Sequence, residues 1–319
     1  MSLLAPSAFL ASAASTRGLQ DELLPADFTS QDSHVQATLN EWRSRHIAPE
    51  PIGSCRERQA SWDNASIATG LQGLQNHFTE PYHKARLLAV QEKHSGDWLH
   101  AWPITACGLR LDDNAIKVAV GLRLGANLCT PHTCHCGTLV DARGNHGLAC
   151  RRSQGRLTRH SLLNDTIQRA LSRAGVQATR EPVGLLRNDG KRPDGCTVVA
   201  WSRGKCLAWD ATTPDTLAAS HLADSSQTPA SAAERAASLK IQKYSEIIKT
   251  HLFCAVAVET MGPINKDGTD FLSEIGRRAT KISGDPRESA FLFQRISVII
   301  QRCNAISFLG TFVSPQVTG

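Results

Sequence analysis

The chain has 319 residues, a formal net charge of +6 and 41% hydrophobic residues, which leaves room for two domains of ordinary size and a sizeable core. No apolar run reaches the ~18 residues that span a bilayer, so we expect no membrane partner. Aromatic residues make up only 5% of the chain, which excludes an extensive stacking platform for single-stranded nucleic acid.

The first 105 residues carry mixed helical patterns at 33–45, 65–77 and 84–92, and proline-containing loops interrupt them. We therefore expect a small helical region at 1–105. Its first residues are small and apolar like those of a signal peptide, but the first basic side chain is Arg17, so the basic segment that begins a signal peptide is missing. We interpret this start as part of a helix and expect a nuclear or cytoplasmic location.

A compact group of cysteines and histidines follows, in a segment that we expect to form a small zinc module at 106–152. Zinc requires four nitrogen or sulfur ligands in a tetrahedron, and closely spaced Cys and His residues joined by a loop supply them. Gly137 and Gly144 permit the turns that such a loop needs. Four candidate ligands lie within about seventeen residues: Cys134, Cys136, His146 and Cys150.

The alternative to a zinc site is a set of buried free cysteines. The spacing of Cys134 and Cys136 is tighter than the usual two to four intervening residues. For that reason Cys129 or His132 could replace one of the four, whereas we expect His135 to point away. A metal-binding group of cysteines also fits a reducing compartment better than a disulfide framework does.

The segment 151–192 is strongly basic, with ten Lys and Arg residues against three acids, and its net charge of +7 accounts for the +6 of the whole chain. A concentrated positive stripe favours a polyanionic partner, because each neutralised phosphate releases counterions. The alternative is an ordinary solvated surface. The basic residues are Arg151, Arg152, Arg156, Arg159, Arg169, Arg173, Arg180, Arg187, Lys191 and Arg192.

Two aspartates lie at equal distances from a predicted turn at residues 201–204. The segment 191–200 has strand character, and 205–210 returns after the Ser-Arg-Gly turn. An antiparallel hairpin centred on residue 202 places Asp194 opposite Asp210, with the two side chains on the same face. Like charges so placed repel each other, and Mg²⁺ or Mn²⁺ would reverse that repulsion because these ions prefer oxygen ligands. The alternative is an exposed hairpin whose two acids are merely solvated.

The elements around this hairpin have a regular order. A helix is predicted at 154–173, a strand at 176–181, the hairpin, a helix at 232–251 and a buried strand at 252–261. This αβββαβ order, with acids at the strand ends, resembles the PD-(D/E)xK restriction-like nuclease fold. The resemblance implies that Asp194 and Asp210, assisted by Glu181, hold the catalytic metal ion.

The chain departs from the family motif after Asp210, where Ala211 and Thr212 stand in place of the usual lysine. We expect the positive charge to come from the next helix, where Lys240 and Lys243 share one face. The alternative is an ordinary solvated basic face. Whichever lysine it is, the resemblance implies that it positions or activates the attacking water.

The Cys/His group followed by Arg159-His160, Glu181-Pro182, Arg192-Pro193-Asp194 and Asp210 resembles the carboxy-terminal module of non-LTR retrotransposons. The resemblance covers about residues 106–312 and implies a zinc module and a restriction-like endonuclease domain at 153–319. Region 1–105 would be a remnant of the polymerase thumb and connector. The polymerase itself is missing, because the nearest approach to its Tyr/Phe-x-Asp-Asp motif is Leu111-Asp112-Asp113, before a helix at 115–124 that we expect Asp113 or Asn114 to cap.

The resemblance also implies the partners of the chain. These are DNA, element RNA and a reverse transcriptase encoded elsewhere, while Arg159 and His160 would hold either DNA or the active-site helix. His160 could equally be an ordinary helix-surface residue. The phosphate-binding residues that we predict are Arg151, Arg152, Arg156, Arg159, His160, Lys191 and Arg192.

Two main hypotheses follow. The first is a DNA endonuclease that requires Mg²⁺ or Mn²⁺ and carries a structural zinc ion. The second is a zinc-containing fragment that grips nucleic acid and no longer cleaves it. The final pattern, at 286–308, predicts a long amphipathic helix that packs on the nuclease sheet.

Overall fold

The computed structural model describes residues 7–8, 10–14, 33–46, 49–53, 58–185 and 190–312. The chain separates into two compact units, residues 1–79 and 80–319. In the first unit, α2 (Ser33–Arg45) begins and ends where the pattern predicted, and α3 (Gln59–His77) starts earlier than expected. Trp42 and Trp62 form its core, with their rings edge to face and their centroids 5.2 Å apart.

The second unit contains a four-stranded mixed sheet in the order β3-β4-β5-β6. Strand β4 is antiparallel to both β3 and β5, and β5 and β6 are parallel. The mixed α/β architecture and the predicted αβββαβ order are therefore confirmed. The elements are α7 (Gln154–Arg173), β3 (Ala178–Arg180), β4 (Gly195–Thr197), β5 (Leu207–Thr212), α9 (Ser231–Lys243) and β6 (Leu252–Ala257).

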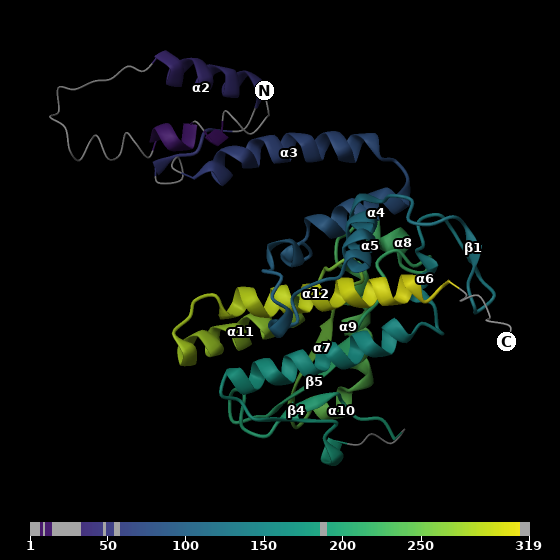
Figure 1. The fold of residues 1–319 in the computed structure, drawn as a ribbon. Helices are drawn as coiled ribbons and strands as arrows, with labels where there is room; N and C mark the ends of the chain where they lie inside the picture. Colours follow the sequence, from purple (N-terminus) through teal and green to yellow (C-terminus); the bar gives the residue numbers. More distant parts are fainter. Residues whose placement is uncertain are drawn as a thin grey trace. The chain divides into compact units, whose positions relative to one another are not determined.

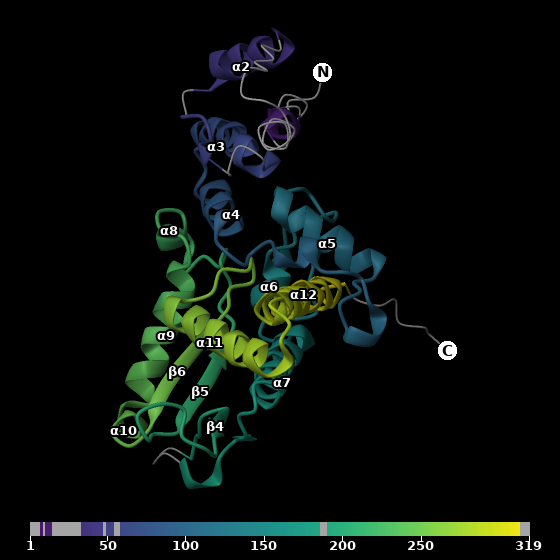
Figure 2. The same cartoon turned by 90° about the vertical axis from the view of Figure 1, so that its left-hand side faces the viewer.

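Helices cover both faces of this sheet. Figure 2 shows β5 and β6 between α9 on one side and α7, α11 (Lys266–Ser283) and α12 (Glu288–Leu309) on the other. Successive residues of a strand point to opposite faces, so Trp209 and Ala211 join the core beneath α7, α11 and α12. Ala208 contributes to the small core on the opposite side, where Tyr244 covers it.

Helix α11 was missing from the sequence prediction. Its apolar residues recur with helical spacing, because Phe271, Leu272, Ile275 and Ala279 all lie on its buried face. The helix predicted at 232–251 was wrong in extent, because the chain leaves α9 at Tyr244 before a short turn of helix, α10 (Ser245–Ile248).

The hairpin has the predicted register but not the predicted length. Gly195 pairs with Trp209 and Cys196 pairs with Ala208, and the same register places position 194 opposite position 210. The regular ladder stops at Thr197, whose hydroxyl accepts the Leu207 N–H at 3.0 Å. Beyond it Val198 is 56% exposed, so the strand predicted at 191–200 was too long at both ends.

The tip of the hairpin is a tight turn. Lys205 donates its N–H to the Ser202 carbonyl at 2.9 Å, and Arg203 and Gly204 between them have φ angles of 52° and 72°. Two successive residues with positive φ are typical of the type I′ turn, whose twist suits an antiparallel pair. The predicted turn is therefore present, but it spans residues 202–205 instead of 201–204.

Residues 80–105 pack within the second unit. Tyr82, Ala85 and Ala89 of α4 (Pro81–Gln91) share a core with α5 (Asp113–Leu124) and with α12. Asp112 caps α5 by accepting the Ala115 N–H at 2.8 Å, so the expected cap by Asp113 or Asn114 was wrong. Figure 1 shows α12 crossing this unit beside α5 and α7.

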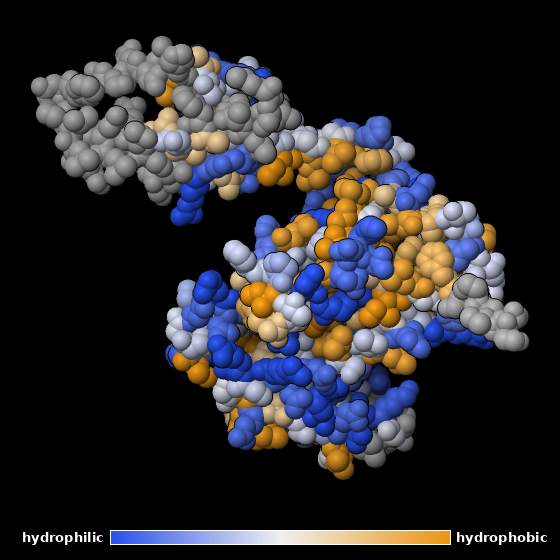
Figure 3. Space-filling view, viewed as in Figure 1, coloured by the Kyte–Doolittle hydropathy of each residue, from blue (hydrophilic) through white to orange (hydrophobic). Residues whose placement is uncertain are grey.

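The surface of the second unit differs from place to place. In Figure 3 hydrophilic side chains cover the surface over α7, whereas hydrophobic side chains gather over α4 and α5. Ile116, Val120 and Leu124 of α5 contribute to this exposed apolar surface. Within the described part of the chain, no helix combines the length and the apolar character that crossing a membrane requires.

Candidate functional site

Asp194 lies immediately before β4 and is held by three donors. Its Oδ2 accepts the Ala211 N–H at 2.7 Å, the Asn164 Nδ2 at 3.0 Å and the His160 Nε2 at 3.0 Å. Burial alone would raise the pKa of Asp194, but the hydrogen bond and charge of His160 outweigh it, and the pKa lies below its ordinary value. Asp194 is therefore an ionised carboxylate at neutral pH.

Asp210 lies in the middle of β5 and is 3% exposed. Its Oδ1 contacts the Lys240 Nζ, which α9 brings across the sheet. A buried carboxylate without a cation nearby would be costly, so this ion pair is the local reason that an acid is tolerated there. Of the two predicted lysines, Lys240 is the one that contacts Asp210.

The two aspartates contact helices on opposite sides of the sheet, which does not fit the prediction that both side chains lie on one face. Asp194 contacts α7, and Asp210 contacts α9. The charges of both acids raise the pKa of His160, after its direct hydrogen bond to Asp194, and the charge of Lys240 lowers it. These four ionisable groups therefore form one electrostatic cluster at the end of the β4–β5 pair.

Each carboxylate keeps one oxygen without a protein partner. Among the contacts of the described residues, Asp194 Oδ1 and Asp210 Oδ2 have no hydrogen-bond donor. Neither is a fully buried atom, whereas Asp210 Oδ1 is buried against Lys240. Two oxygens of this kind suit a hard cation.

The other predicted members of this site lie elsewhere. Glu181 forms an ion pair with Arg192, at 2.5 Å between Oε2 and Nη2, and its N–H donates to the Asp194 carbonyl at 2.9 Å. Its backbone therefore adjoins the site, while its side chain is 59% exposed. Lys243 donates to the Tyr244 hydroxyl at 3.1 Å.

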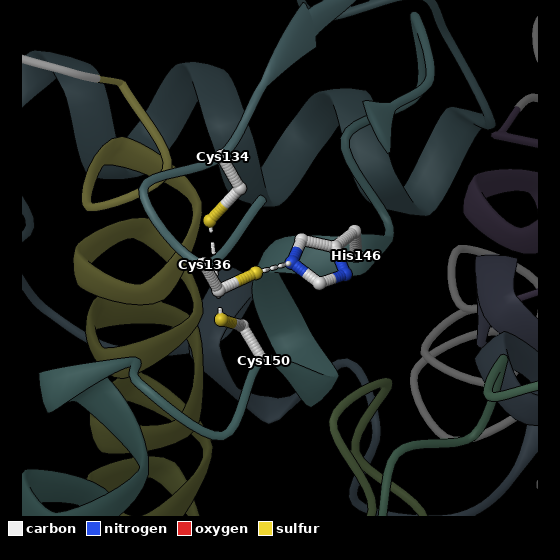
Figure 4. A group of neighbouring side chains, drawn as sticks. All are labelled: Cys134, Cys136, His146 and Cys150. Carbon is white, nitrogen blue, oxygen red and sulfur yellow. Dashed lines mark hydrogen bonds between the residues drawn. The ribbon is translucent and has the colours of Figure 1, made fainter. Parts of the chain in front are cut away.

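The four predicted zinc ligands lie together, which confirms this cluster. The ligand atoms of Cys134, Cys136, His146 and Cys150 all lie within 4.8 Å of one another. Figure 4 shows the three sulfur atoms and the His146 ring pointing toward a common centre, with Cys136 Sγ 3.2 Å from His146 Nε2. This donor set fits a metal such as zinc. Among the described residues, it is the one group of three or more Cys, His, Asp or Glu that is close enough to hold an ion.

Local backbone geometry builds this cluster. The strands β1 (His132–Thr133) and β2 (Leu139–Val140) form a small hairpin, and Gly137 at its tip donates to the Cys134 carbonyl at 2.7 Å with a φ of 89°. His146 begins α6 (His146–Ala149). A Cβ at Gly147 would approach the Phe308 Cα to 2.9 Å, so α6 packs directly on α12.

The thiols of the cluster differ in acidity. Hydrogen bonds from Thr138 lower the pKa of Cys136 to about 6, whereas burial raises the pKa of Cys134 to about 11. Because the thiolate is the form that binds metal, Cys136 is the first of these two thiols to offer a ligand as pH rises.

The alternative ligands are engaged elsewhere. Cys129 donates its thiol to the Asp141 carbonyl at 3.3 Å, and His132 contacts the Thr311 hydroxyl at 2.9 Å. His135 lies 3.6 Å from the Cys134 sulfur through Nδ1 but is not a member of the cluster.

The predicted phosphate-binding residues differ in how far their side chains are exposed. Arg151, Arg152, Arg156 and Lys191 are exposed, as binding to a phosphate backbone requires. Arg152 donates to the His135 carbonyl at 3.2 Å, which ties it to the Cys/His hairpin. Two charges counted in the basic stripe, Arg187 and Asp189, lie outside the described residues.

The DNA contact predicted for Arg159 is not compatible with its position. The side chain is fully buried, and its Nη2 lies 3.4 Å from the Ser307 hydroxyl of α12. Burial lowers the pKa of Arg159, and the charge of buried Asp215 acts in the opposite direction. Arg159 therefore holds α7 against α12. Helical spacing was the available signal, because Arg159 lies four residues before Leu163 and eight before Ile167, which are both fully buried.

Two residues of the acidic site were not predicted as members. Asn164 bonds to Asp194, and the Trp209 indole N–H donates to the Asn164 Oδ1 at 3.0 Å. The spacing of His160 and Asn164, one helical turn apart, was the available signal for the first. No protein-family model matches the chain, and no curated protein matches its sequence.

Proposed function

We propose that the chain is a metal-dependent DNA endonuclease, as expected for the restriction-like module that its sequence resembles. The observation that carries this proposal is the contact of Lys240 with Asp210, in a strand register that sets Asp210 opposite Asp194. A lysine beside one of two acids is the combination that the nuclease motif uses. Here the lysine comes from α9 because the position after Asp210 is Ala211.

The roles follow from the positions of the side chains. Asp194 and Asp210 would hold Mg²⁺ or Mn²⁺ through the oxygens that have no protein partner. The cation supplies Lewis-acid polarisation of a phosphate oxygen and makes bound water more acidic. Lys240 would orient the attacking water, and Glu181, whose backbone adjoins Asp194, would assist. His160 keeps Asp194 ionised.

The Cys/His cluster would hold a structural zinc ion. Its four ligand atoms lie within 4.8 Å of one another, and four protein ligands are the number that a closed structural zinc site uses. The exposed Arg151 and Arg152 follow the last ligand, Cys150, directly, so the metal would fix the position of a phosphate-binding segment. These residues also favour the second candidate function, a fragment that binds nucleic acid without cleaving it.

Plasmid nicking tests the proposal. The purified chain should convert supercoiled DNA to the open circular form with Mg²⁺ or Mn²⁺, and the double variant Asp194→Ala, Asp210→Ala should lose this activity. The matched control removes two exposed acids, Asp224 and Asp270, by the same substitutions. Equal nicking by the site variant would refute the nuclease, and salt-sensitive binding without any nicking would favour the second candidate.

A further inference from the structure

Asp194 is bound on one side only. All three of its protein donors converge on Oδ2, and Oδ1 has none among the contacts of the described residues. Because a carboxylate rotates about a single bond, three donors on one oxygen fix the direction of the other. The donor that comes from a side chain buried in the core is Asn164, which is 0% exposed.

The amide of Asn164 could in principle face Asp194 with either end. Its nitrogen donates hydrogen bonds and its oxygen accepts them, so a reversed amide would set an oxygen against the carboxylate. Trp209 removes this ambiguity, because an indole N–H can only donate and it meets the Asn164 oxygen at 3.0 Å. With the oxygen committed to Trp209, the nitrogen faces Asp194 and the His160 carbonyl, to which it also donates at 3.2 Å.

Trp209 is itself fixed. The side chain is 0% exposed in the core beneath α7. Its ring lies against Gly195, where a Cβ would come within 2.1 Å of it. An indole that is packed this closely on all sides can adopt only one orientation. The packing of Trp209 in the sheet therefore fixes the orientation of the Asn164 amide, and that amide in turn fixes the orientation of the Asp194 carboxylate.

We propose that Asn164 is a positioning residue for Asp194 and that Trp209 sets the orientation of its amide. The consequence for the site rests on the proposed function: this chain of bonds aims Asp194 Oδ1 at the cation. Positioning partners of metal ligands typically change metal affinity by about 10–100-fold when they are removed. Neither residue touches the substrate or the reacting atoms in this proposal.

Two variants each remove a different hydrogen bond of the series that runs from Trp209 through Asn164 to Asp194. Trp209→Phe keeps an aromatic ring but removes the N–H that holds the Asn164 oxygen. Asn164→Asp keeps an acceptor for Trp209 but replaces the donor to Asp194 with a carboxylate oxygen. The matched control is Trp201→Phe, since the Trp201 ring packs on Phe271 and Arg278 and its indole N–H makes no hydrogen bond among the described contacts.

NMR of the full chain tests the amide claim without any metal or activity. In the wild type and in Trp201→Phe, the Asn164 side-chain amide protons should exchange slowly and give two separate signals. In Trp209→Phe they should exchange about 10-fold faster, as expected when an ordered hydrogen bond is lost. Unchanged exchange in Trp209→Phe, in a chain whose other signals show it to be folded, would overturn the claim.

Mn²⁺ titration tests the consequence for the site. The dissociation constant for Mn²⁺, measured by paramagnetic broadening of the Ala211 backbone amide signal beside Asp194, should rise about 10-fold in Trp209→Phe and in Asn164→Asp. It should stay unchanged in Trp201→Phe. Equal affinity in all four proteins would overturn the positioning role. A wild type that binds Mn²⁺ no better than Asp194→Ala would instead refute the proposed function, while the exchange measurement still decides the amide claim.

Discussion

His160 and Asp194 form an ion pair, with Nε2 and Oδ2 3.0 Å apart. The pair joins α7 to the residue that immediately precedes β4. The pair shifts both partners. Its hydrogen bond raises the pKa of His160, and the same bond helps to bring the pKa of Asp194 below its ordinary value against the effect of burial. His160 therefore stays charged to a higher pH than a free histidine.

These shifts predict a pH-dependent contribution to stability. The raised pKa of His160 makes the pair fully stabilising below about pH 6.5, and this contribution is lost as pH rises through the folded pKa. The lowered pKa of Asp194 sets the lower pH limit. The stabilisation that comes from ionised Asp194 is fully present above about pH 4 and is lost as pH falls through the pKa of Asp194 in the folded state. The pair should therefore stabilise most between these limits.

The variant His160→Gln measures this effect. Its thermal midpoint should fall below that of the wild type by about 2–4 °C at pH 5.5, which corresponds to the ~1 kcal/mol of a half-exposed pair. The difference should shrink at pH 9. His100→Gln, at an exposed histidine, is the control, and a deficit that grows with pH would contradict the assignment.

The two predicted lysines should separate in activity. Lys240→Ala should slow plasmid nicking by about 10²-fold or more, because it removes the charge next to Asp210 and the group that orients water. Lys243→Ala should change the rate by less than about 3-fold, since its amine contacts the Tyr244 hydroxyl instead. The measurement is the single-turnover rate at saturating Mg²⁺. A larger loss in Lys243→Ala would move the role to that residue.

Metal content should distinguish the cluster from its neighbours. The purified chain should contain one zinc ion, and Cys150→Ser should lose it and unfold at a temperature lower by about 5 °C or more. Cys129→Ser should keep the ion, because that thiol donates to the Asp141 carbonyl. Elemental analysis and a thermal scan of both variants provide the check. Zinc loss in Cys129→Ser would show that the ligand set is wrong.

The buried and exposed arginines of α7 should behave differently with DNA. Arg156→Ala should lower the slope of log affinity against log salt by about 1, because one phosphate contact is removed. Arg159→Met should leave the slope unchanged, because this side chain is fully buried. Fluorescence anisotropy at several salt concentrations measures both slopes. Equal slopes for the two variants would contradict the division made by the structure.

Local sequence signals predicted part of this architecture well. Helix α7 has the bounds that its apolar pattern indicated, Gln154–Arg173, because the pattern and the stop at Gly175 agree. The register of β4 and β5 agrees with the hairpin predicted around residue 202, although the turn itself is centred between Arg203 and Gly204. The Cys/His cluster followed from spacing, since its ligands are close in the sequence as well as in space.

The remaining features depend on packing between distant segments. The burial of Arg159 depends on α12, which lies more than a hundred residues later in the chain. The choice of Lys240 over Lys243 depends on how α9 crosses β5. The bond from Trp209 to Asn164 joins residues 45 positions apart. Helical spacing places residues on a face, but it does not say what that face meets.

Helix α12 lies against the carboxy-terminal end of the Cys/His segment and against the start of α7. Gly147 in α6 approaches the Phe308 Cα, and at Gly155 in α7 a Cβ would meet the Ser307 hydroxyl at 2.1 Å. The metal-binding hairpin and the first helix of the sheet are thus fitted to one shared surface. A chimera that imports a foreign Cys/His segment would consequently need the matching stretch of α12, so the two parts can be exchanged only as a set.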